Sequence, residues 1–229
     1  MVDHLLIQYH NIAEGQESSY GKWLDSILMP KLRSAGFHKL EWYRLSAIQI
    51  NPDYSQPFSY AALYEFSGDP VISAKLFAEQ GRAEAKRAGY ILDDRSHLFD
   101  YVTDVIPSGQ SAEPGSSEYL QLVMGNYVPS MEEEYRRYYD DIHGPEVLGV
   151  PGFVSLRRGR LSDIQAEPQN DQPANAIIVE RIFSSNVQSV FDEFRARYFG
   201  TSPAGIHWQD RSPSAAPSTT HIFTPIFKI

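Results

Sequence analysis

His143 is the residue of this chain whose type and position point most directly to chemistry. It follows Tyr135 by eight residues and Tyr139 by four, so an α-helix would place all three on one face, with Asp140 one turn back. A helix C-terminus favours a charged imidazolium, whereas burial favours the neutral ring. A histidine between these two influences can pass protons near neutral pH. We therefore predict that His143 is a general acid or base, oriented by Asp140 or Asp141.

Several aromatic and histidine side chains elsewhere in the chain could line a pocket around the substrate. Four of them fall on expected strands, where alternation turns some side chains toward a space between sheets. Another follows Ser-Pro-Ala-Gly in a loop that could cover a pocket mouth. The candidate substrate-binding residues are Tyr9, His10, Trp42, Tyr64, Tyr139 and His207. The alternative for the aromatic residues is ordinary core packing. The alternative for His10 is a surface or hydrogen-bonded histidine, and that for His207 is a plain loop anchored by Trp208.

The elements that position these residues occur twice along the chain. Residues 20–30 match 135–145, with Tyr, an aromatic residue, Asp, Ile and Pro in step. Past one inserted residue, Gly-Phe at 36–37 matches 152–153, Arg-Leu-Ser at 44–46 matches 160–162, and Asp-Arg-Ser at 94–96 matches 210–212. Two unrelated segments with similar helices are the alternative. Residues 106–117 are rich in Pro, Gly and Ser, which is typical of a linker.

We therefore expect a first repeat over residues 1–106, a linker over 107–117, and a second repeat over 118–229 that carries the histidine motif. The position that matches His143 is Leu28, although Asp25 and Pro30 match Asp140 and Pro145. A helix cap before Gly-Pro is the alternative role for His143. A histidine needed by the fold would be expected in both repeats, so its absence from the first favours function and indicates one active and one degenerate half.

Hydrophobic periodicity predicts the same order of elements in each repeat. The first repeat has expected strands at 5–10, 39–45, 60–66 and 98–106 and helices at 17–33 and 71–87. The second has strands at 119–124, 153–160, 176–183 and 220–227 and helices around 131–142 and 187–198, the former with Ser130 as N-cap and Glu133 completing a capping box. This is the ferredoxin-like βαββαβ order, twice.

Each such unit is an α+β fold, with one antiparallel sheet that two helices cover on one face. Two bare faces can pack together and bury apolar area at about 25 cal/mol per Å². We expect a barrel-like pseudo-dimer with the helices outside and an apolar chamber between the sheets, bordered by His143. A single chain can supply both sheets, so a monomer or a homodimer is possible.

The segment from Tyr135 to Phe153 resembles the EthD-type motif of the dimeric α+β barrel superfamily. It has an aromatic-rich helix, a histidine followed closely by proline, and Pro-Gly before the next strand. The resemblance implies that barrel fold and a small enzyme without a cofactor, because many members are dehydratases, decarboxylases, cyclases, lactone isomerases or quinone-forming monooxygenases. Haem-binding members also exist, and a single haem-ligating histidine leaves no pattern in one sequence.

The composition narrows the classes of partner. The 20 basic and 29 acidic residues give a net charge of −9, which argues against nucleic acid or an anionic membrane as partner. The chain has no cysteine, and its histidines are scattered without an i, i+4 pair. No leader-like or membrane-spanning stretch stands out in the sequence, so we expect a cytoplasmic protein. We also expect no metal site and no cofactor.

Together these observations predict a cofactor-independent enzyme of secondary metabolism that acts on an aromatic or polyketide-like substrate. The expected reaction is dehydration, decarboxylation or cyclisation by histidine acid–base catalysis in an apolar pocket. A cofactor-free monooxygenase is the alternative within enzymes. A non-catalytic binding or stress-response barrel is the alternative outside them, and a cavity of a few hundred Å³ reached by His143 would favour the enzyme.

Overall fold

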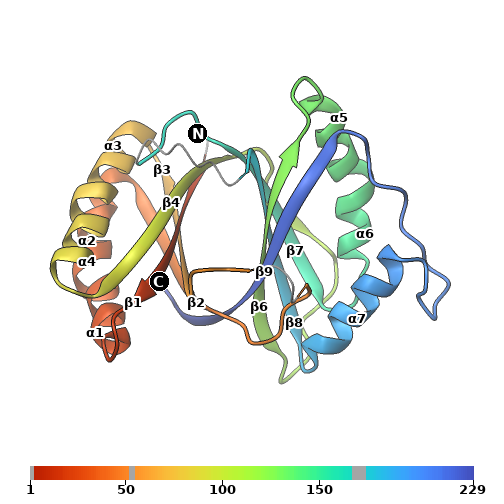
Figure 1. Cartoon of the computed structure of the whole chain (residues 1–229), viewed down its shortest axis with the longest axis horizontal. Helices are drawn as coiled ribbons and strands as arrows, with labels where there is room; N and C mark the ends of the chain where they lie inside the picture. Colours follow the sequence, from red (N-terminus) through yellow and green to blue (C-terminus); the bar gives the residue numbers. More distant parts are fainter. Residues whose placement is uncertain (1–2, 52–54, 167–173) are drawn as a thin grey trace.

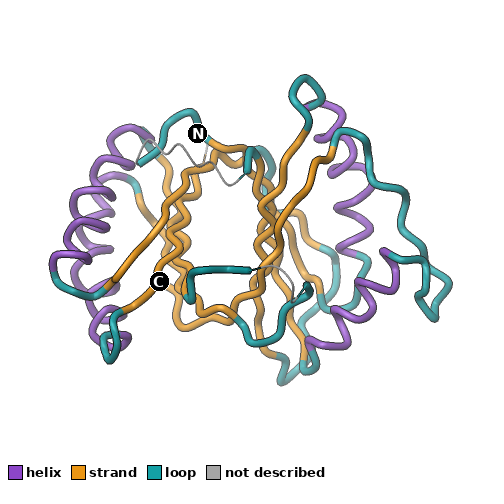
Figure 2. Tube along the Cα trace, in the orientation of Figure 1, coloured by secondary structure: helices purple, strands orange, loops and turns teal. Residues whose placement is uncertain are grey.

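The chain folds as one closed sheet between two layers of helices. The computed structural model describes residues 3–51, 55–166 and 174–229. Within these residues the strand order is β4-β1-β3-β2-β9-β6-β8-β7-β5, and β4 also pairs with β7, so the sheet closes on itself. The strands fill the middle of the molecule and the helices lie outside on two opposite sides (Figures 1 and 2).

The first half contributes four long strands and the helices on one side. The strands are β1 (Asp3–Ile12), β2 (Phe37–Leu45), β3 (Tyr60–Ser67) and β4 (Ile91–Tyr101). The helical segments between β1 and β2 are α1 (Glu17–Trp23), η1 (Leu24–Leu28), α2 (Met29–Leu32) and η2 (Arg33–Ala35). Those between β3 and β4 are α3 (Pro70–Leu76), η3 (Phe77–Arg82) and α4 (Ala83–Arg87).

The second half contributes the remaining strands and the helices on the other side. The strands are β5 (Ile106–Pro107), β6 (Ser117–Tyr127), β7 (Phe153–Leu161), β8 (Ala176–Ser184) and β9 (Ala215–Lys228). The helical segments are α5 (Glu132–Arg137), η4 (Tyr138–His143), α6 (Gly144–Leu148) and α7 (Val187–Tyr198). Among the described residues, the helices are too short or too polar to cross a membrane.

The predicted α+β class with a large antiparallel sheet is confirmed. The first half orders its long strands β4-β1-β3-β2 and the second orders them β9-β6-β8-β7, with every pairing antiparallel. The two orders correspond strand for strand, as a ferredoxin-like unit on each side would give. That the halves arose by tandem duplication stays a prediction.

Some predicted element boundaries are wrong. Ser130 has a φ of 71° and lies before the helix, which starts at Glu132 after Met131 without a side-chain cap, so the expected capping box does not form. Glu133 pairs instead with Arg136 at 2.6 Å. The last strand of the first half begins at residue 91 rather than 98, and the final strand begins at 215 rather than 220.

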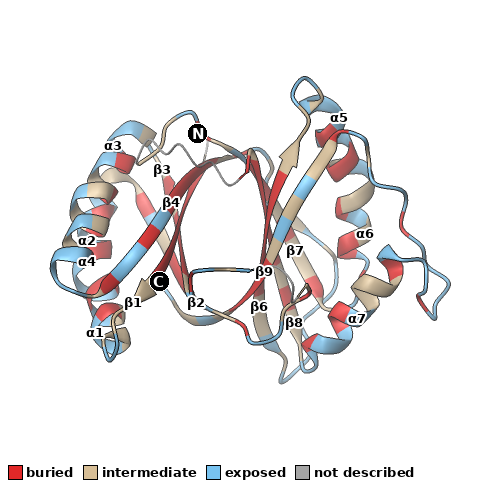
Figure 3. Ribbon diagram, viewed as in Figure 1, coloured by how far each residue is buried: buried red, intermediate tan, exposed pale blue. Residues whose placement is uncertain are grey.

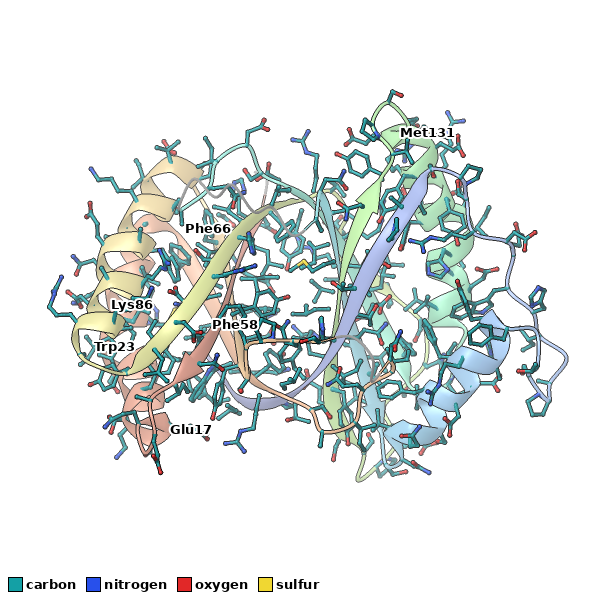
Figure 4. The ribbon with its side chains drawn as sticks, in the orientation of Figure 1. Glu17, Trp23, Phe58, Phe66, Lys86 and Met131 are labelled. Atoms are coloured by element: carbon teal, nitrogen blue, oxygen red, sulfur yellow. The ribbon has the colours of Figure 1, made fainter. Side chains whose placement is uncertain are left out.

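Side chains from both halves fill the space between the facing parts of the sheet. The interior cluster consists of Leu5, Ile7, Tyr9, Tyr43, Phe58, Ala61, Leu63, Phe99, Tyr101, Leu120, Leu122, Met124, Ala174, Ile177, Val179 and Phe223, all buried. Long stretches of the strands around this space are coloured as buried in Figure 3, and Phe58 is labelled beside it in Figure 4. The chamber predicted between the sheets is therefore wrong, because this core occupies its place.

Each half also sends a loop across to the other. After β2, the backbone N–H of Ser46 donates to Ile222 O, and the side chain of Gln49 binds both Ile222 O and Ile222 N at 2.9 Å. After β7, Ser162 N donates to Leu98 O, and Gln165 binds Leu98 through its backbone carbonyl at 2.9 Å and its N–H at 3.0 Å. These reciprocal contacts, which we call the glutamine latches, explain why a serine ends both Arg-Leu-Ser segments and a glutamine follows each serine by three residues.

Of the two other sequence matches between the halves, the structure explains Gly-Phe and contradicts Asp-Arg-Ser. Gly36 and Gly152 both have positive φ, 88° and 100°, where the helix turns into the next strand, and a Cβ on Gly36 would collide with the Ser67 carbonyl oxygen. The match between residues 94–96 and 210–212 is wrong. Asp94 lies inside β4 and pairs with Arg82 at 2.5 Å, whereas residues 210–212 precede β9.

Replacing Gln49 with alanine should destabilise the whole barrel. The substitution leaves the backbone groups of Ile222 without these partners, so we expect the free energy of unfolding to fall by about 1–3 kcal/mol. Urea unfolding measures this loss, and Gln165→Ala should give a similar value. The control is Gln188→Ala on the exposed face of α7, expected within about 0.5 kcal/mol of the unchanged protein. Equal stability of all three variants would contradict a latching role.

Candidate functional site

A cavity of about 520 Å³ lies on the helix side of the second-half sheet. Strand alternation places Leu120 and Leu122 in the interior cluster, so Gln121 and Val123, which alternate with them, face the helices. The lining residues are Ile50, Asn51, Gln121, Val123, Tyr138, Tyr139, His143, Val147, Glu180, Phe194, Arg195, Tyr198, Phe199, Arg211, Ser218 and Thr220. The hollow predicted near His143 is thus present, but outside the barrel rather than between its sheets.

A π-helical turn in the middle of a longer helix holds His143 over this cavity. The turn spans Tyr138–His143, and the N–H of Gly144 donates to Tyr139 O, five residues back. Pro145 follows at once, and a wide turn accommodates a residue that has no N–H to donate. The helix then continues to Leu148, so His143 does not end it. The alternative interpretation, in which His143 caps the end of the helix, is therefore wrong.

Aromatic rings surround the His143 imidazole. It stacks on Tyr138 with ring centroids 5.4 Å apart and an interplanar angle of 6°. Tyr139 and Trp208 meet it edge-on, with centroids at 5.1 Å and 5.3 Å. The side chain is 18% exposed, so the ring is held by packing while part of it remains accessible. Such packing fixes the ring plane against the cavity, as an acid–base group requires.

The carboxylate beside His143 is Glu146, not Asp140. His143 Nδ1 lies 3.5 Å from Glu146 Oε2, and neither atom has a hydrogen-bond partner among the described residues. Asp140 points elsewhere: one of its oxygens pairs with Arg158 at 2.5 Å and the other with Arg136 at 3.2 Å. The prediction that Asp140 orients His143 is therefore wrong. Arg158 is only 4% exposed, so its buried charge needs a carboxylate close by. Asp140 supplies that carboxylate and is not available to His143.

Two buried polar side chains lie side by side under the cavity. Gln121 on β6 and Glu180 on β8 are direct partners in the antiparallel register, and both line the cavity. Burial raises the pKa of the Glu180 carboxyl to about 8, and a hydrogen bond from Gln121 opposes that rise. At neutral pH the carboxyl is therefore mostly uncharged, which makes it a hydrogen-bond donor.

The sequence did not single out Glu180 or Gln121. The available signal was the alternation along β8, where Ile178, Glu180 and Ile182 share the helix-facing side and only the middle one is polar. A carboxylate in the middle of an apolar stripe is costly unless it is neutralised or used, so it marks a candidate site. Arg195 and Arg211 at the cavity were also missed as site residues. Arg195 lies within the predicted helix α7, and Arg211 was noted only as part of the Asp-Arg-Ser match.

The predicted substrate-binding residues divide between the two halves. Tyr139 lines the cavity. His207 is exposed and packs on Gly200, whose added Cβ would come within 2.7 Å of the His207 ring, and the neighbouring Trp208 contacts His143 instead. Tyr9 belongs to the interior cluster of the barrel. Neither Tyr9 nor His207 is among the residues that line the His143 cavity, so these two placements do not support their predicted role in substrate binding there.

His10, Trp42 and Tyr64 lie in the first half, buried among the side chains between its helices and sheet. The Trp42 indole N–H donates to His10 Nε2 at 3.2 Å, and burial lowers the pKa of His10 to about 4. His10 therefore stays neutral and serves packing at neutral pH. This placement is far in the fold from the His143 cavity, because the barrel core lies between the two helical layers (Figure 3).

The residues at corresponding positions of the two sheets explain why this cavity occurs in the second half and not at the same place in the first. Leu6 pairs with Tyr64 on β3 and with Leu98 on β4, whereas Gln121 pairs with Glu180 on β8 and with Ile222 on β9. In the first half the tyrosine ring and its neighbours fill the space under the helices. A smaller, polar pair in the second half leaves room for a ligand.

Three structural likenesses place the fold. A solved anthrone oxidase-like protein matches with a TM-score of 0.62 at 8% identity, over 100% of this chain and 92% of that chain. A candidate monooxygenase from Lactobacillus acidophilus NCFM matches with a TM-score of 0.59 at 9% identity, over 100% and 96% of the two chains. A mutant chlorite dismutase from Candidatus Nitrospira defluvii gives 0.51 at 10% identity, over 97% and 91%.

These likenesses show a shared dimeric α+β barrel, ferredoxin-like fold. No protein-family model and no curated protein matches the sequence, so the resemblance to the EthD-type motif stays a prediction. Across residues 3–51, 55–166 and 174–229, no cluster of three or more His, Asp or Glu side chains is arranged to hold a metal ion.

Gly144→Ala should disturb the π-turn that carries His143. A Cβ at this position would lie 2.5 Å from Tyr139 O, so the backbone must shift and the wide turn must distort. We expect a loss of about 1–3 kcal/mol in unfolding free energy, measured by thermal denaturation. Gly149→Ala, where the nearest oxygens would lie at 3.3 Å, is the matched control and should lose less. A fully tolerated Gly144→Ala would contradict the close contact.

Proposed function

We propose that this protein is an enzyme that moves a proton on an aromatic small molecule bound in the His143 cavity. The observation that carries the proposal is the position of a packed, partly accessible imidazole in the wall of a cavity of about 520 Å³. That volume lies within the usual range for small-molecule sites, and the walls are mainly apolar. A barrel that takes no small molecule would have no need to keep this space open, and the packed imidazole in the cavity wall favours catalysis over binding alone.

The walls suit a flat, aromatic ligand. Tyr138, Phe194 and Tyr198 line the cavity beside His143, and aromatic faces stack on planar rings. Dehydration, decarboxylation and aldol-type cyclisation of such molecules all need a proton removed or delivered next to a carbonyl group. Histidine supplies this step without a cofactor, and the lyase or cyclase of secondary metabolism expected from the sequence is the leading form of the proposal.

Glu146 supports the basic role of His143. Glu146 Oε2 lies 3.5 Å from His143 Nδ1 and has no hydrogen-bond partner among the described residues. When the imidazole takes a proton, this oxygen is placed to stabilise the new positive charge. The backbone N–H of Gln209 donates to the other Glu146 oxygen at 2.7 Å, which fixes the carboxylate. We therefore assign to Glu146 the positioning role that the sequence suggested for Asp140.

The proposal extends to the organisation of the chain. We propose a tandem duplication with repeats at 1–106 and 118–229 joined by a linker at 107–117, in which the second repeat is active. The reciprocal glutamine latches and the equal strand orders support it. A chain that closes its own barrel needs no partner to fold, so a monomer is consistent with the proposal.

A second form of the function is oxygenation of the same kind of substrate without a cofactor. The names of the structural relatives, an anthrone oxidase-like protein and a candidate monooxygenase, favour it. Anthrone has an acidic methylene opposite its carbonyl group. Removal of one methylene proton by His143 gives an enolate that reacts with O₂, and anthrone plus O₂ yields anthraquinone plus water. Both forms of the function begin with the same proton transfer.

Anthrone is thus a probe for both forms. Under nitrogen in D₂O, the protein should accelerate deuterium uptake at the anthrone methylene, followed by NMR, and His143→Ala should slow the catalysed exchange about 10²–10⁴-fold. In air, an oxygenase would also convert anthrone to anthraquinone, followed by absorbance. A lyase or cyclase would catalyse the exchange alone.

The control variant is His38→Ala, which removes an exposed histidine from β2 in the first half. It should leave exchange and thermal stability unchanged. If His143→Ala folded normally and catalysed exchange at the original rate, the assignment of His143 as the base would be wrong.

A further inference from the structure

The paired side chains under the cavity are built as a polar site within an apolar face. Glu180 is 2% exposed and Gln121 is 1% exposed, and they face each other across neighbouring strands. Glu180 Oε2 and Gln121 Oε1 have no hydrogen-bond partner among the described residues. Buried polar atoms normally have partners, so a pair left open beside a cavity points to a bound group that supplies them.

The arginines near Glu180 bind other groups. From β7, the Arg158 guanidinium is paired with Asp140, and from α7, Arg195 is paired with Asp192 at 2.7 Å. The remaining titratable or charged neighbours in the cavity wall are Tyr138, Tyr139 and His143 from η4 and Arg211 from the loop before β9, which binds Ala216 O. Glu180 thus keeps its proton at neutral pH.

We infer that Glu180, in its acid form and held by Gln121, donates a hydrogen bond to the carbonyl oxygen of an aromatic ketone in the cavity. The inference rests on the proposed function and names its substrate class. An uncharged carboxylic acid in an apolar site is a strong donor to an oxygen on which negative charge develops. When His143 removes a proton next to the carbonyl group, the electron pair of the broken C–H bond moves toward this oxygen, and Glu180 stabilises the enolate.

The first half provides an internal comparison. The register position of Gln121 holds Leu6, and that of Glu180 holds Tyr64, whose hydroxyl lies 3.5 Å from Gln8 Oε1. A carbonyl group placed there would meet an aliphatic side chain and a filled core. The donor pair therefore occurs where the cavity occurs, and it is absent where the matching space is packed.

Binding of an inert ketone tests the inference apart from catalysis. The probe is 9-fluorenone, a flat aromatic ketone without a removable proton beside its carbonyl group, and fluorene is the matched hydrocarbon. By calorimetry at pH 7, fluorenone should bind about tenfold more tightly than fluorene. Glu180→Leu should bind the two equally, with fluorene affinity retained.

The pH dependence of fluorenone binding shows whether Glu180 donates a hydrogen bond or only makes the cavity wall polar. Only the acid form of Glu180 can donate, so fluorenone affinity should be constant at low pH and fall about fivefold between pH 7 and pH 9, toward the affinity of fluorene. Glu180→Gln keeps a donor without a titrating proton, so its preference for fluorenone should persist at both values. Fluorene affinity should not change with pH in any variant.

Two results would overturn the inference. One is equal binding of fluorenone and fluorene by the unchanged protein, which would mean that Glu180 and Gln121 satisfy each other. The other is a fluorenone affinity that does not depend on pH. Because fluorenone binding needs no turnover, loss of deuterium exchange in His143→Ala with fluorenone binding intact would support both proposals separately. Exchange without any ketone preference would leave the proposed function standing and remove this inference.

Discussion

Burial of the inner sheet faces against each other is the constraint on which the rest of the structure depends. Each half has a four-stranded sheet with helices on one side only, and its other face is apolar. Pairing of β2 with β9 and of β4 with β7 closes the edges and encloses the buried interior cluster. This closure removes exposed strand edges, which are otherwise sites of aggregation. The helical layers are then free to differ.

Ionic contacts across the barrel reinforce that closure. Arg181 on β8 binds Glu41 and the Tyr43 hydroxyl on β2, and Arg157 on β7 pairs with Glu65 on β3 at 3.3 Å. Burial and the Arg181 charge act oppositely on Glu41, and its pKa is lowered below the ordinary value. Removing one member of such a buried pair leaves the other charge uncompensated, which costs more than the pair itself contributes. These contacts therefore specify how the halves fit.

The two helical layers differ in how the space between helices and sheet is filled. The first layer fills its space with large rings, and a neutral histidine is hydrogen-bonded to an indole among them. The second layer replaces that filling with an imidazole, an acid and an amide around a cavity. One layer can contribute stability while the other carries polar groups that a core would not tolerate. A chain with both layers filled would be a barrel without a site.

The sequence by itself determined the order of elements and the α+β class, and it singled out the segment around His143 as a candidate site. Periodicity reports which face of a helix or strand is apolar, and Gly36 and Gly152 mark turns that only glycine makes easily. Only the tertiary structure decided which groups meet. Asp140 was matched to His143 by spacing but pairs with Arg158 from another strand, and Glu180 became notable only when β8 placed it under a cavity. Burial and partner choice depend on residues far apart in the chain, and local patterns do not contain that information.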